Sequence, residues 1–318
     1  MRAAVVTDFD TPPTCQDFPV PVPRDPDEVL VDVLAAGLHP RVRSQANGSH
    51  YTSSDELPLV PGIDGVGRAP DGTLRYFILP DTTMGAMAEQ TVIDLRRSVV
   101  LPVGSDPVLI AAAMNPAMSS WLALRQRIDF TAGQRVLVLG ATGNAGRMAI
   151  GVAKYLGASH VIGAGRQPAK LAALAELGAD ATVSLDGAAP DAAERLGHAA
   201  CDVDVVIDYL WGQPAADAIA AVVTDRADRG KPLAWIQIGS VAGPTAAVPS
   251  AALRAARLQI VGSGQGSVPA RAIVAELPAL ADAITAGTFQ VDARTVPLAD
   301  IETAWKDTGS SQRIVITP

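Results

Sequence analysis

Residues 135–157 read RVLVLGATGNAGRMAIGVAKYLG, a short apolar run followed by three spaced glycines and an alanine-rich amphipathic stretch. The pattern predicts a buried strand, a tight turn and a helix. Gly140 allows the sharp turn, Gly143 removes a side chain where backbone meets a pyrophosphate, and Gly146 lets helix and strand pack closely. The amides that open the helix carry partial positive charge, which favours a bound anion. The motif predicts dinucleotide binding, with a ligand-free tight turn as the alternative; the candidate residues are Gly140, Thr142, Gly143, Asn144, Ala145 and Gly146.

The sequence around this motif alternates short apolar runs with alanine-rich stretches, a pattern typical of βαβ units and a parallel sheet. Six strands are expected, at residues 136–139, 161–162, 182–185, 205–207, 233–238 and 259–261. Six is the number of strands in the doubly wound dinucleotide-binding fold. The expected fold class is therefore α/β, with a Rossmann dinucleotide-binding domain over residues 119–265.

The residues after the second strand indicate which dinucleotide binds. An NAD site usually has a carboxylate about 20 residues beyond the glycines, where it accepts a hydrogen bond from the ribose 2′-hydroxyl. In this chain Arg166 stands 20 residues after Gly146, and no Asp or Glu lies between Gly163 and Lys170. A guanidinium forms a planar fork on a 2′-phosphate, and a nearby ammonium adds a point charge. Arg166 and Lys170 therefore favour NADPH as the cofactor; the alternative is that Arg166 is a solvated loop cation.

The rest of the chain predicts a second, β-rich domain in two parts. Residues 1–118 show short strands, proline-rich turns and little helical periodicity before residue 107. Residues 266–318 begin with a helix expected over 269–286, closed by Gly287, and end in the strand sequence RIVIT. These last residues are too few to fold alone, so we expect them to rejoin the first domain.

The composition limits the classes of partner. The chain has 318 residues with 25 Lys and Arg against 33 Asp and Glu, and no block of five basic residues, so binding of nucleic acid or a membrane surface is not expected. Cys15 and Cys201 are too few for a disulfide framework, which favours a cytoplasmic location. Asp8 interrupts the apolar start, so a secretory signal is not expected. The uncharged stretch 107–124 contains Pro116 and polar residues, which favours a buried helix pair over a membrane span.

The order of these motifs resembles the medium-chain dehydrogenase/reductase superfamily and, within it, the zinc-free NADPH:quinone oxidoreductase group. The resemblance covers nearly the whole chain. The segments that carry it are AAGLHPRVRSQANGSHY (35–51), LPLVPGIDGVG (57–67), NPAMSSWLAL (115–124), VLVLGATGNAGRMA (136–149) and QRIVI (312–316). It implies a GroES-like substrate domain that is split in sequence around the dinucleotide-binding domain.

The resemblance does not extend to a metal site. Zinc members of the superfamily carry Gly-His-Glu-x-x-Gly, whereas residues 62–67 of this chain read GIDGVG, so Ile63 replaces the imidazole ligand. A catalytic zinc normally needs three protein ligands, and the four-Cys structural lobe cannot be built from two cysteines. We therefore expect no metal. Asp64 keeps a carboxylate at the family's Glu position; the alternative is that it bonds backbone in a glycine-rich turn.

The catalytic candidates also follow from the resemblance. In zinc-free relatives an Asn-Pro-x-Asp segment and a Tyr about ten residues later face the nicotinamide. The matching residues here are 39–42, HPRV, and Tyr51, so His replaces Asn and Val replaces Asp. His39 is implied as a donor of a proton or hydrogen bond to the reduced oxygen, and Tyr51 as a hydrogen-bond partner of the acceptor carbonyl or the ribose. A structural histidine and a packing tyrosine are the alternatives.

The resemblance extends the cofactor site beyond the glycine motif. Ser119 matches a Thr near the nicotinamide and phosphates, and Asn115 lies one helical turn before it. Tyr209 and Trp211 follow the fourth strand and are either adenine-side or core aromatic residues. The remaining candidates are Gly239 and Ser240 after the fifth strand, Ser263 and Gly264 after the sixth, and Arg313 near the C-terminus.

Together these residues imply hydride transfer from NADPH to a quinone or other conjugated carbonyl without a metal. Conjugation spreads the new negative charge over a phenolate or enolate, so hydrogen-bond donors can replace a Lewis acid. The alternatives are an enoyl or 2-alkenal reductase, and a non-catalytic NADPH-binding redox sensor. The resemblance and the apolar edge strand 259–263 also imply a homodimer, because an exposed edge strand tends to pair.

Overall fold

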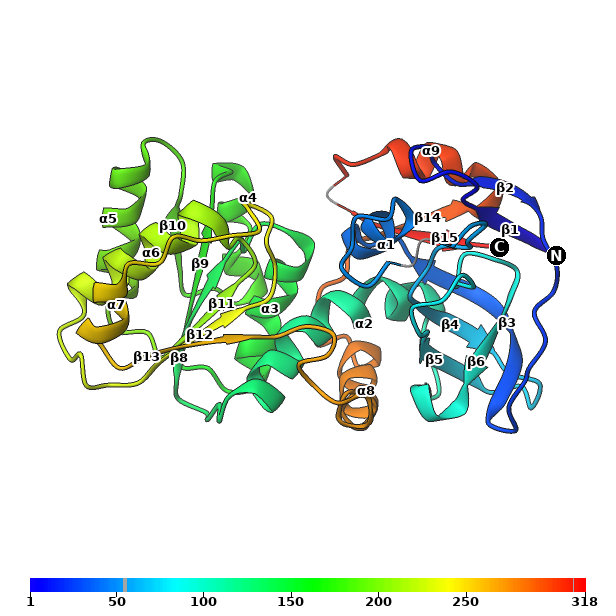
Figure 1. Ribbon diagram of the computed structural model, residues 1–318. Coiled ribbons are helices and arrows are strands. Elements are labelled where there is room, and N and C mark those ends of the chain that lie inside the picture. Colours follow the sequence, from blue (N-terminus) through cyan, green and yellow to red (C-terminus); the bar gives the residue numbers. More distant parts are fainter. Residues whose placement is uncertain (54–55, 311) are drawn as a thin grey trace. The chain divides into compact units, whose positions relative to one another are not determined.

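The computed structural model describes residues 1–53, 56–310 and 312–318, and the chain divides into two compact units (Figure 1). Unit 1 comprises Met1–Asn115, Ala270–Gly287 and Val291–Pro318, and unit 2 comprises Pro116–Pro269 and Thr288–Gln290. The boundaries expected from the sequence, 118/119 and 265/266, lie within four residues of these divisions. The short segment 288–290 differs from the expectation, because it packs with unit 2.

Unit 2 contains a parallel sheet with the strand order β10-β9-β8-β11-β12-β13. Its strands are β8 (Arg135–Leu139), β9 (His160–Gly165), β10 (Ala181–Ser184), β11 (Val205–Asp208), β12 (Leu233–Gln237) and β13 (Leu258–Gly262). The prediction of an α/β fold with six parallel strands is confirmed. The chain winds outward from β8 in one direction and then in the other, so the strand order reverses at β8. In such sheets ligands bind at that reversal, beyond the carboxyl ends of the strands.

Helices connect these strands because the alanine-rich stretches bury an apolar stripe on the sheet. They are α3 (Asn144–Tyr155), α4 (Pro168–Ala172), α5 (Ala189–Ala200), α6 (Gly212–Asp225) and α7 (Ser250–Ala255), with a 3₁₀ turn at Ala175–Leu177. Helix α3 packs on β8 and β9, and α5, α6 and α7 lie side by side (Figure 1). Leu137, Val206 and Trp235 are buried in the core between helices and sheet.

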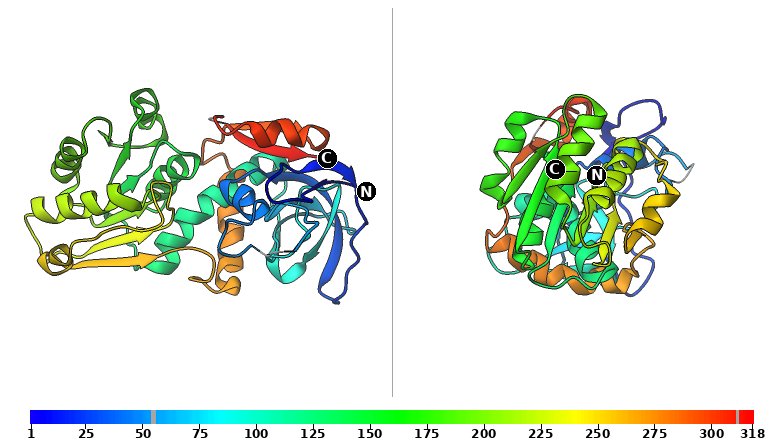
Figure 2. Two further views of the ribbon diagram at one scale, coloured as in Figure 1. Left: turned by 45° about the horizontal axis from the view of Figure 1, so that its top comes forward. Right: turned by 90° about the vertical axis from the view of Figure 1, so that its left-hand side faces the viewer.

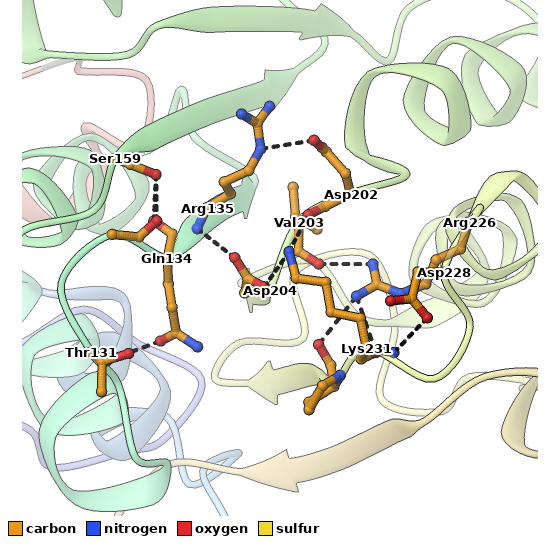
Figure 3. A network of polar contacts seen from close by, with 12 residues as sticks. Thr131, Gln134, Arg135, Ser159, Asp202, Val203, Asp204, Arg226, Asp228 and Lys231 are labelled. Atoms are coloured by element: carbon orange, nitrogen blue, oxygen red, sulfur yellow. Dashed lines mark hydrogen bonds and ion pairs between the residues drawn. The ribbon is translucent and has the colours of Figure 1, made fainter.

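A polar network joins the amino ends of β8, β11 and β12 (Figure 3). Arg226 is 3% exposed and donates to the carbonyl oxygen of Val203 at 2.8 Å, with further bonds to the carbonyls of Cys201, Lys231 and Pro232. Arg135 pairs with Asp202 at 3.1 Å. The Arg226 bonds satisfy carbonyl groups at the edge opposite the carboxyl ends, so the network stabilises that edge of the sheet.

Helix α2 (Pro107–Leu122) continues as a π-helical turn, Ala123–Arg127. The expected helix pair is wrong, because α2 runs through Pro116 without breaking. Proline removes one helical hydrogen bond, but the residues around it are buried on apolar contacts that outweigh this loss. Pro107–Arg127 is the one described segment that is long and apolar enough to cross a membrane, and 67% of its most apolar window is buried inside the protein.

Unit 1 is built on an antiparallel-rich sheet with the order β14-β15-β3-β4-β5-β7, and β6 also pairs with β3. Its strands are β3 (Glu28–Gly37), β4 (Asp64–Arg68), β5 (Leu74–Ile78), β6 (Gln90–Asp94), β7 (Ser98–Val100), β14 (Ala293–Pro297) and β15 (Arg313–Thr317); β1 (Arg2–Val5) and β2 (Thr14–Asp17) form a separate pair. β15 pairs with β3 at Val315 and Gly37, so the last residues complete a sheet begun by the first. In Figure 2 the red C-terminal segment accordingly lies beside the blue N-terminal strands of this unit.

The helices of unit 1 are α1 (Pro40–Ala46), α8 (Ala270–Thr285) and α9 (Ile301–Lys306), with 3₁₀ turns at Leu95–Arg97 and Leu298–Asp300. The helix expected over 269–286 corresponds to α8, and it is followed by Gly287 at φ +73°. Helix α1 begins directly after His39, which occupies the N-cap position, and Pro40 fits its first turn because that position needs no amide donor. This local sequence fixes where the His39 side chain leaves the backbone.

Candidate functional site

The turn between β8 and α3 carries the glycine motif. Gly140 has φ +82°, in the left-handed region that glycine adopts without strain. A Cβ atom at Gly146 would lie 2.3 Å from the carbonyl oxygen of Gly140, so glycine is needed for α3 to pack this closely. At Gly143 a Cβ would lie 3.6 Å from the same oxygen, which is an ordinary contact, and Gly143 is exposed. The backbone at Gly143 is therefore open on the side where a ligand would approach.

The first turn of α3 leaves its amide groups available. The N-cap residue is Gly143, and no side chain of the described residues caps the helix there. The first helical bond runs from the Arg147 amide to the Gly143 carbonyl at 2.9 Å, so the amides of Asn144, Ala145 and Gly146 precede it. Such an uncapped helix start binds anions well, because its donors and its dipole both favour negative charge.

Thr142 connects this turn to the end of β9. A Cβ at Gly165 would lie 2.7 Å from Thr142 Cγ2, so the threonine side chain occupies the space above the last residue of that strand. The two candidate cations for the 2′-phosphate lie just beyond this strand in the chain. Arg166 comes directly after β9, and Lys170 lies in α4. Both are exposed, and neither forms an ion pair with any residue that the structure describes. They are therefore available to a phosphate group at this end of β9.

The loop after β11 packs against the glycine turn and against the end of β12. A Cβ at Gly140 would lie 3.3 Å from Tyr209 Cβ, and a Cβ at Gly239 would lie 2.7 Å from the Tyr209 carbonyl oxygen. Ser240 and Gly264 are exposed, whereas Ser263 is buried and its amide donates to the Gln237 carbonyl at 2.8 Å. Because all six strands are parallel, these loops share one edge of the sheet.

Ser119 of α2 joins the same cluster through Tyr209. Its Oγ lies 2.8 Å from the Tyr209 hydroxyl oxygen, and it also donates to the Pro116 carbonyl at 2.7 Å. Each hydroxyl has one hydrogen, so Tyr209 donates to Ser119 and Ser119 donates to Pro116. Burial raises the pKa of Tyr209 to about 12, which keeps the phenol protonated. Tyr209 is thus a buried core residue whose hydroxyl group bonds Ser119, a candidate cofactor-binding residue.

Asp208, the last residue of β11, shapes the loop that carries Tyr209. Its Oδ1 accepts from the amides of Leu210 and Trp211 at 2.8 and 3.0 Å, and its Oδ2 accepts from Trp235 Nε1 at 2.9 Å. Burial raises the pKa of this carboxyl, and the three donors act against that shift. Trp211 has φ 51°, an unusual value for a residue other than glycine. Asp208 therefore stabilises a strained loop at the carboxyl edge.

The catalytic candidates belong to unit 1. His39 is 2% exposed, and its Nε2 lies 3.0 Å from Asp64 Oδ1. Asp64 is 1% exposed and accepts a second bond, from the Tyr76 hydroxyl, at 2.6 Å. The alternative expectation for Asp64, bonding to backbone in a glycine-rich turn, is not what its described contacts show, because its carboxylate bonds two side chains. Burial lowers the pKa of His39, and the Asp64 charge partly offsets this effect.

The other candidates of unit 1 differ in exposure. Tyr51 is 74% exposed and stacks on His50 with ring centroids 4.4 Å apart. Asn115 is half-buried near the end of the unit 1 part of α2. Arg313 is buried in β15 and donates to the Leu38 carbonyl at 3.1 Å, and burial lowers its pKa to about 10. Contacts of Tyr51, Asn115 and Arg313 with substrate or cofactor stay predictions.

The side chains at the position of the family's zinc ligands do not fit a metal. Ile63 is buried among apolar residues, and Asp64 is committed to His39 and Tyr76. Within the described ranges, no group of three or more His, Cys, Asp or Glu could hold a metal ion. The donor set is therefore too small for a catalytic zinc.

The structure brings together the candidates on the carboxyl edge of the unit 2 sheet: Gly140, Thr142, Gly143, Asn144, Ala145, Gly146, Arg166, Gly239, Ser240, Ser263 and Gly264. Sequence reasoning missed Tyr76 and Asp208. A charged residue that ends the apolar run VVID is a signal that could have found Asp208. Tyr76 lies in an ordinary strand, LRYFI, that carries no such signal.

Comparison with known proteins places the chain in a family. A family model described as zinc-binding dehydrogenase matches residues 145–283. The probable NADPH-dependent quinone reductase tdiC of Emericella nidulans is 30% identical, and the match covers 100% of both chains. The chloroplastic NADPH-dependent alkenal/one oxidoreductase of Arabidopsis thaliana is 28% identical over 49% of this chain and 45% of that protein.

Solved structures show the same fold. The quinone oxidoreductase of Thermus thermophilus, also determined in complex with NADPH, has a TM-score of 0.81 and 24% identity over 100% of both chains. The agreement extends over both units of the fold, and the full-length match to the Emericella protein agrees with it in sequence. The chain therefore belongs to the medium-chain dehydrogenase/reductase superfamily, in its zinc-free, quinone oxidoreductase-like group.

Proposed function

We propose that this protein is an NADPH-dependent oxidoreductase that reduces a quinone or another conjugated carbonyl compound. The observation that carries the proposal is the uncapped start of α3, a feature that suits an anion, followed one strand later by Arg166, which forms no ion pair with the described residues. The relatives support the proposal, since the Emericella protein is named a probable NADPH-dependent quinone reductase.

The cofactor would be held along the carboxyl edge of the unit 2 sheet. The open backbone at Gly143 and the amides of Asn144 and Ala145 suit the pyrophosphate. Arg166 and Lys170 suit the 2′-phosphate that distinguishes NADPH from NADH. The loops at Gly239 and Ser263 would border the nicotinamide half. When bound, NADPH supplies the hydride, and the chain supplies orientation and hydrogen bonds.

The choice of a conjugated acceptor follows from the donor set. A simple ketone concentrates the new charge on one oxygen and benefits from a Lewis acid. Here Ile63 occupies the ligand position, and Asp64, the next residue in the chain, bonds His39. Hydrogen-bond donors such as His39 and Tyr51 stabilise a phenolate or enolate, whose charge is already delocalised. A quinone or enone is therefore the acceptor class that these residues serve best.

A second candidate is reduction of the carbon–carbon double bond of an enone or 2-alkenal. The similarity to the Arabidopsis alkenal/one oxidoreductase favours it. The same hydride donor and the same oxygen-facing groups would serve, because the hydride arrives at the β-carbon and the enolate oxygen receives the stabilisation. An assay distinguishes the two candidates. NADPH turnover is measured under the same conditions with a quinone and with an alkenal, and the higher kcat/KM identifies the acceptor.

We also propose a homodimer formed through β13. This strand pairs with β12 on one side, and Leu258, Ile260 and Val261 are partly exposed. An apolar edge strand of this kind stabilises itself by pairing with a second copy. Light scattering should give twice the mass of the chain for the wild type. A Val261→Asp variant should give the monomer mass, and a monomeric wild type would refute the dimer.

A cytoplasmic location is proposed as well. Cys15 and Cys201 are both free thiols in the structure, which suits a reducing compartment. Cell fractionation tests this: the protein should appear in the soluble fraction with a cytoplasmic marker enzyme, and recovery with membranes would contradict the proposal.

A further inference from the structure

Two side chains of unit 1 converge on one buried carboxylate. Asp64 is the first residue of β4, and its Oδ1 lies 3.0 Å from His39 Nε2 while its Oδ2 lies 2.6 Å from the Tyr76 hydroxyl oxygen. All three side chains are at most 2% exposed. They come from three elements, the N-cap of α1 and strands β4 and β5, so the fold and not a local turn creates the cluster.

The protons in this cluster have one consistent arrangement. Burial and the Asp64 charge raise the pKa of Tyr76 well above its usual value of 10.0, so the phenol keeps its hydrogen and donates to Asp64 Oδ2. An ionised carboxylate accepts hydrogen bonds and donates none. The 3.0 Å contact at Oδ1 therefore requires a hydrogen on His39 Nε2. Asp64 thereby selects the Nε2–H tautomer of the imidazole.

The other ring nitrogen of His39 has no partner within the described part of the chain. Nδ1 is buried and has no hydrogen-bond partner among the described residues, an arrangement that costs free energy in a purely structural histidine. The ring is also fixed in place: a Cβ at Gly37 would lie 2.6 Å from His39 Cε1 and 2.7 Å from Nε2. The imidazole is thus packed on the β3 backbone, bonded on one side and unpaired on the other.

We propose that Asp64, held by Tyr76, is a positioning residue that orients His39 so that Nδ1 delivers the proton taken up by the reduced oxygen of the acceptor. This inference rests on the proposed function. A quinone gains a hydride from NADPH and a proton from Nδ1 of protonated His39. It leaves as the hydroquinone, with NADP⁺ as the oxidised product. His39 returns to its neutral form and takes its next proton from water, so atoms and electrons balance.

The charges around His39 set the pH at which this donor works. Asp64 on β4 favours the protonated ring, whereas burial and the guanidinium groups of Arg313 on β15 and Arg41 on α1 disfavour it. Tyr76 on β5 stays neutral. The result is a pKa of His39 below the ordinary value of 6.5. Activity that needs the protonated ring is therefore full below this pKa and falls as the pH rises through it.

The test is the pH profile of kcat/KM for a quinone, measured for the wild type and for Asp64→Asn. Removing the carboxylate lowers the proton affinity of His39, so the falling limb should move to lower pH by about 1 to 3 units. Above that limb kcat/KM should drop at least about tenfold, while the affinity for NADPH stays unchanged. Asp64→Glu keeps the negative charge, so the falling limb of its kcat/KM profile should lie at the same pH as in the wild type. Asp32→Asn, an exposed carboxylate of β3, is the matched control and should leave the profile unchanged.

A second readout does not depend on activity. Nitrogen-15 NMR of the full chain labelled in its four histidines, with His39 assigned from a His39→Gln variant, should show Nε2 protonated and Nδ1 unprotonated near neutral pH. The His39 pKa should fall further in Asp64→Asn. The Nδ1–H tautomer in the wild type would overturn the inference, even if Asp64→Asn fails to fold.

The outcomes also separate this inference from the proposed function. If the wild type reduces quinones but Asp64→Asn keeps the wild-type pH limb, the positioning role is wrong and the function stands. If the wild type reduces no quinone or enone, the proposed function fails and with it the proton delivery, whatever tautomer the NMR spectrum shows. A shifted limb in Asp64→Asn together with rescue by Asp64→Glu supports the inference.

Discussion

Gly146 and the carbonyl oxygen of Gly140 approach so closely that a Cβ atom on Gly146 would lie 2.3 Å from that oxygen. The contact joins the start of α3 to the end of β8. The contact fixes the position of the amides that open α3 relative to the edge of the sheet. A Cβ atom at Gly143, in contrast, would make only an ordinary contact, so the turn is open on the Gly143 side. The two glycines therefore serve different purposes and can be tested separately.

Gly146→Ala should destabilise the fold. The added methyl group meets backbone atoms that cannot move aside, and such overpacking costs at least about 2 kcal/mol of unfolding free energy. Chemical denaturation of the two proteins checks this value. A variant as stable as the wild type would show that α3 can shift away from β8.

Gly143→Ala is the matched variant and should fold normally, since its Cβ makes an ordinary 3.6 Å contact. The methyl group would instead point to where the pyrophosphate approaches. We expect the Kd for NADPH to rise about tenfold or more, measured by cofactor fluorescence. An unchanged Kd would remove the pyrophosphate from this turn.

Arg166→Ala should weaken binding of NADPH and leave NADH unaffected, because NADH has no 2′-phosphate. A lost charge-assisted pair corresponds to about 1.5–3 kcal/mol, which is roughly tenfold to hundredfold in Kd. Titration calorimetry with both cofactors measures the change. Arg254→Ala, at the exposed surface of α7, is the control; an equal loss of NADH affinity in Arg166→Ala would contradict the 2′-phosphate assignment.

Ser119→Ala and Tyr209→Phe should each destabilise the protein by about 1–2 kcal/mol, and the double variant by less than the sum, because they share one hydrogen bond. Additive effects in urea unfolding would show that the bond contributes nothing.

The pKa of Tyr209, raised to about 12 by burial, adds a pH dependence. The stability of the neutral phenol is fully present below pH 10.0, the ordinary value, and is lost as the pH rises toward 12.

Arg226→Met should lower the free energy of unfolding by about 3 kcal/mol, because it leaves several buried carbonyl groups without a donor. The network lies at the amino edge of the sheet, so the Kd for NADPH should not change. Arg229→Met, at an exposed neighbouring position, should cost less than about 0.5 kcal/mol. Thermal unfolding followed by circular dichroism compares the variants.

The sequence predicted the unit 2 sheet well because each strand is a local pattern. Runs such as RVLVL and LAWIQ are apolar, short and bounded by turn residues, so their structure follows from neighbours in the chain. Helix α2 was mispredicted as a pair for the complementary reason. Pro116 is a strong local breaker, and burial of the surrounding residues, which the local pattern does not reveal, keeps the helix continuous.

The candidate site divides in the same way. The glycine turn and Arg166 are adjacent to strands in sequence, so spacing alone located them. The partners of Asp64 are 25 and 12 residues away, and Tyr209 is 90 residues from Ser119. Such pairs form through tertiary packing, and one sequence carries no local signal for them. The tautomer of His39 could not be predicted, because it depends on the Asp64 contact.

The most direct test of the account is oxidation of NADPH and NADH by the chelator-treated protein in the presence of an ortho-quinone, a para-quinone and an alkenal, followed by loss of reduced-cofactor absorbance. We predict turnover with NADPH that survives the chelator, a clear preference over NADH, and reduction of at least one quinone. Tight NADPH binding without turnover on any acceptor would contradict the proposed enzyme and point to a redox-sensing role for the cofactor site.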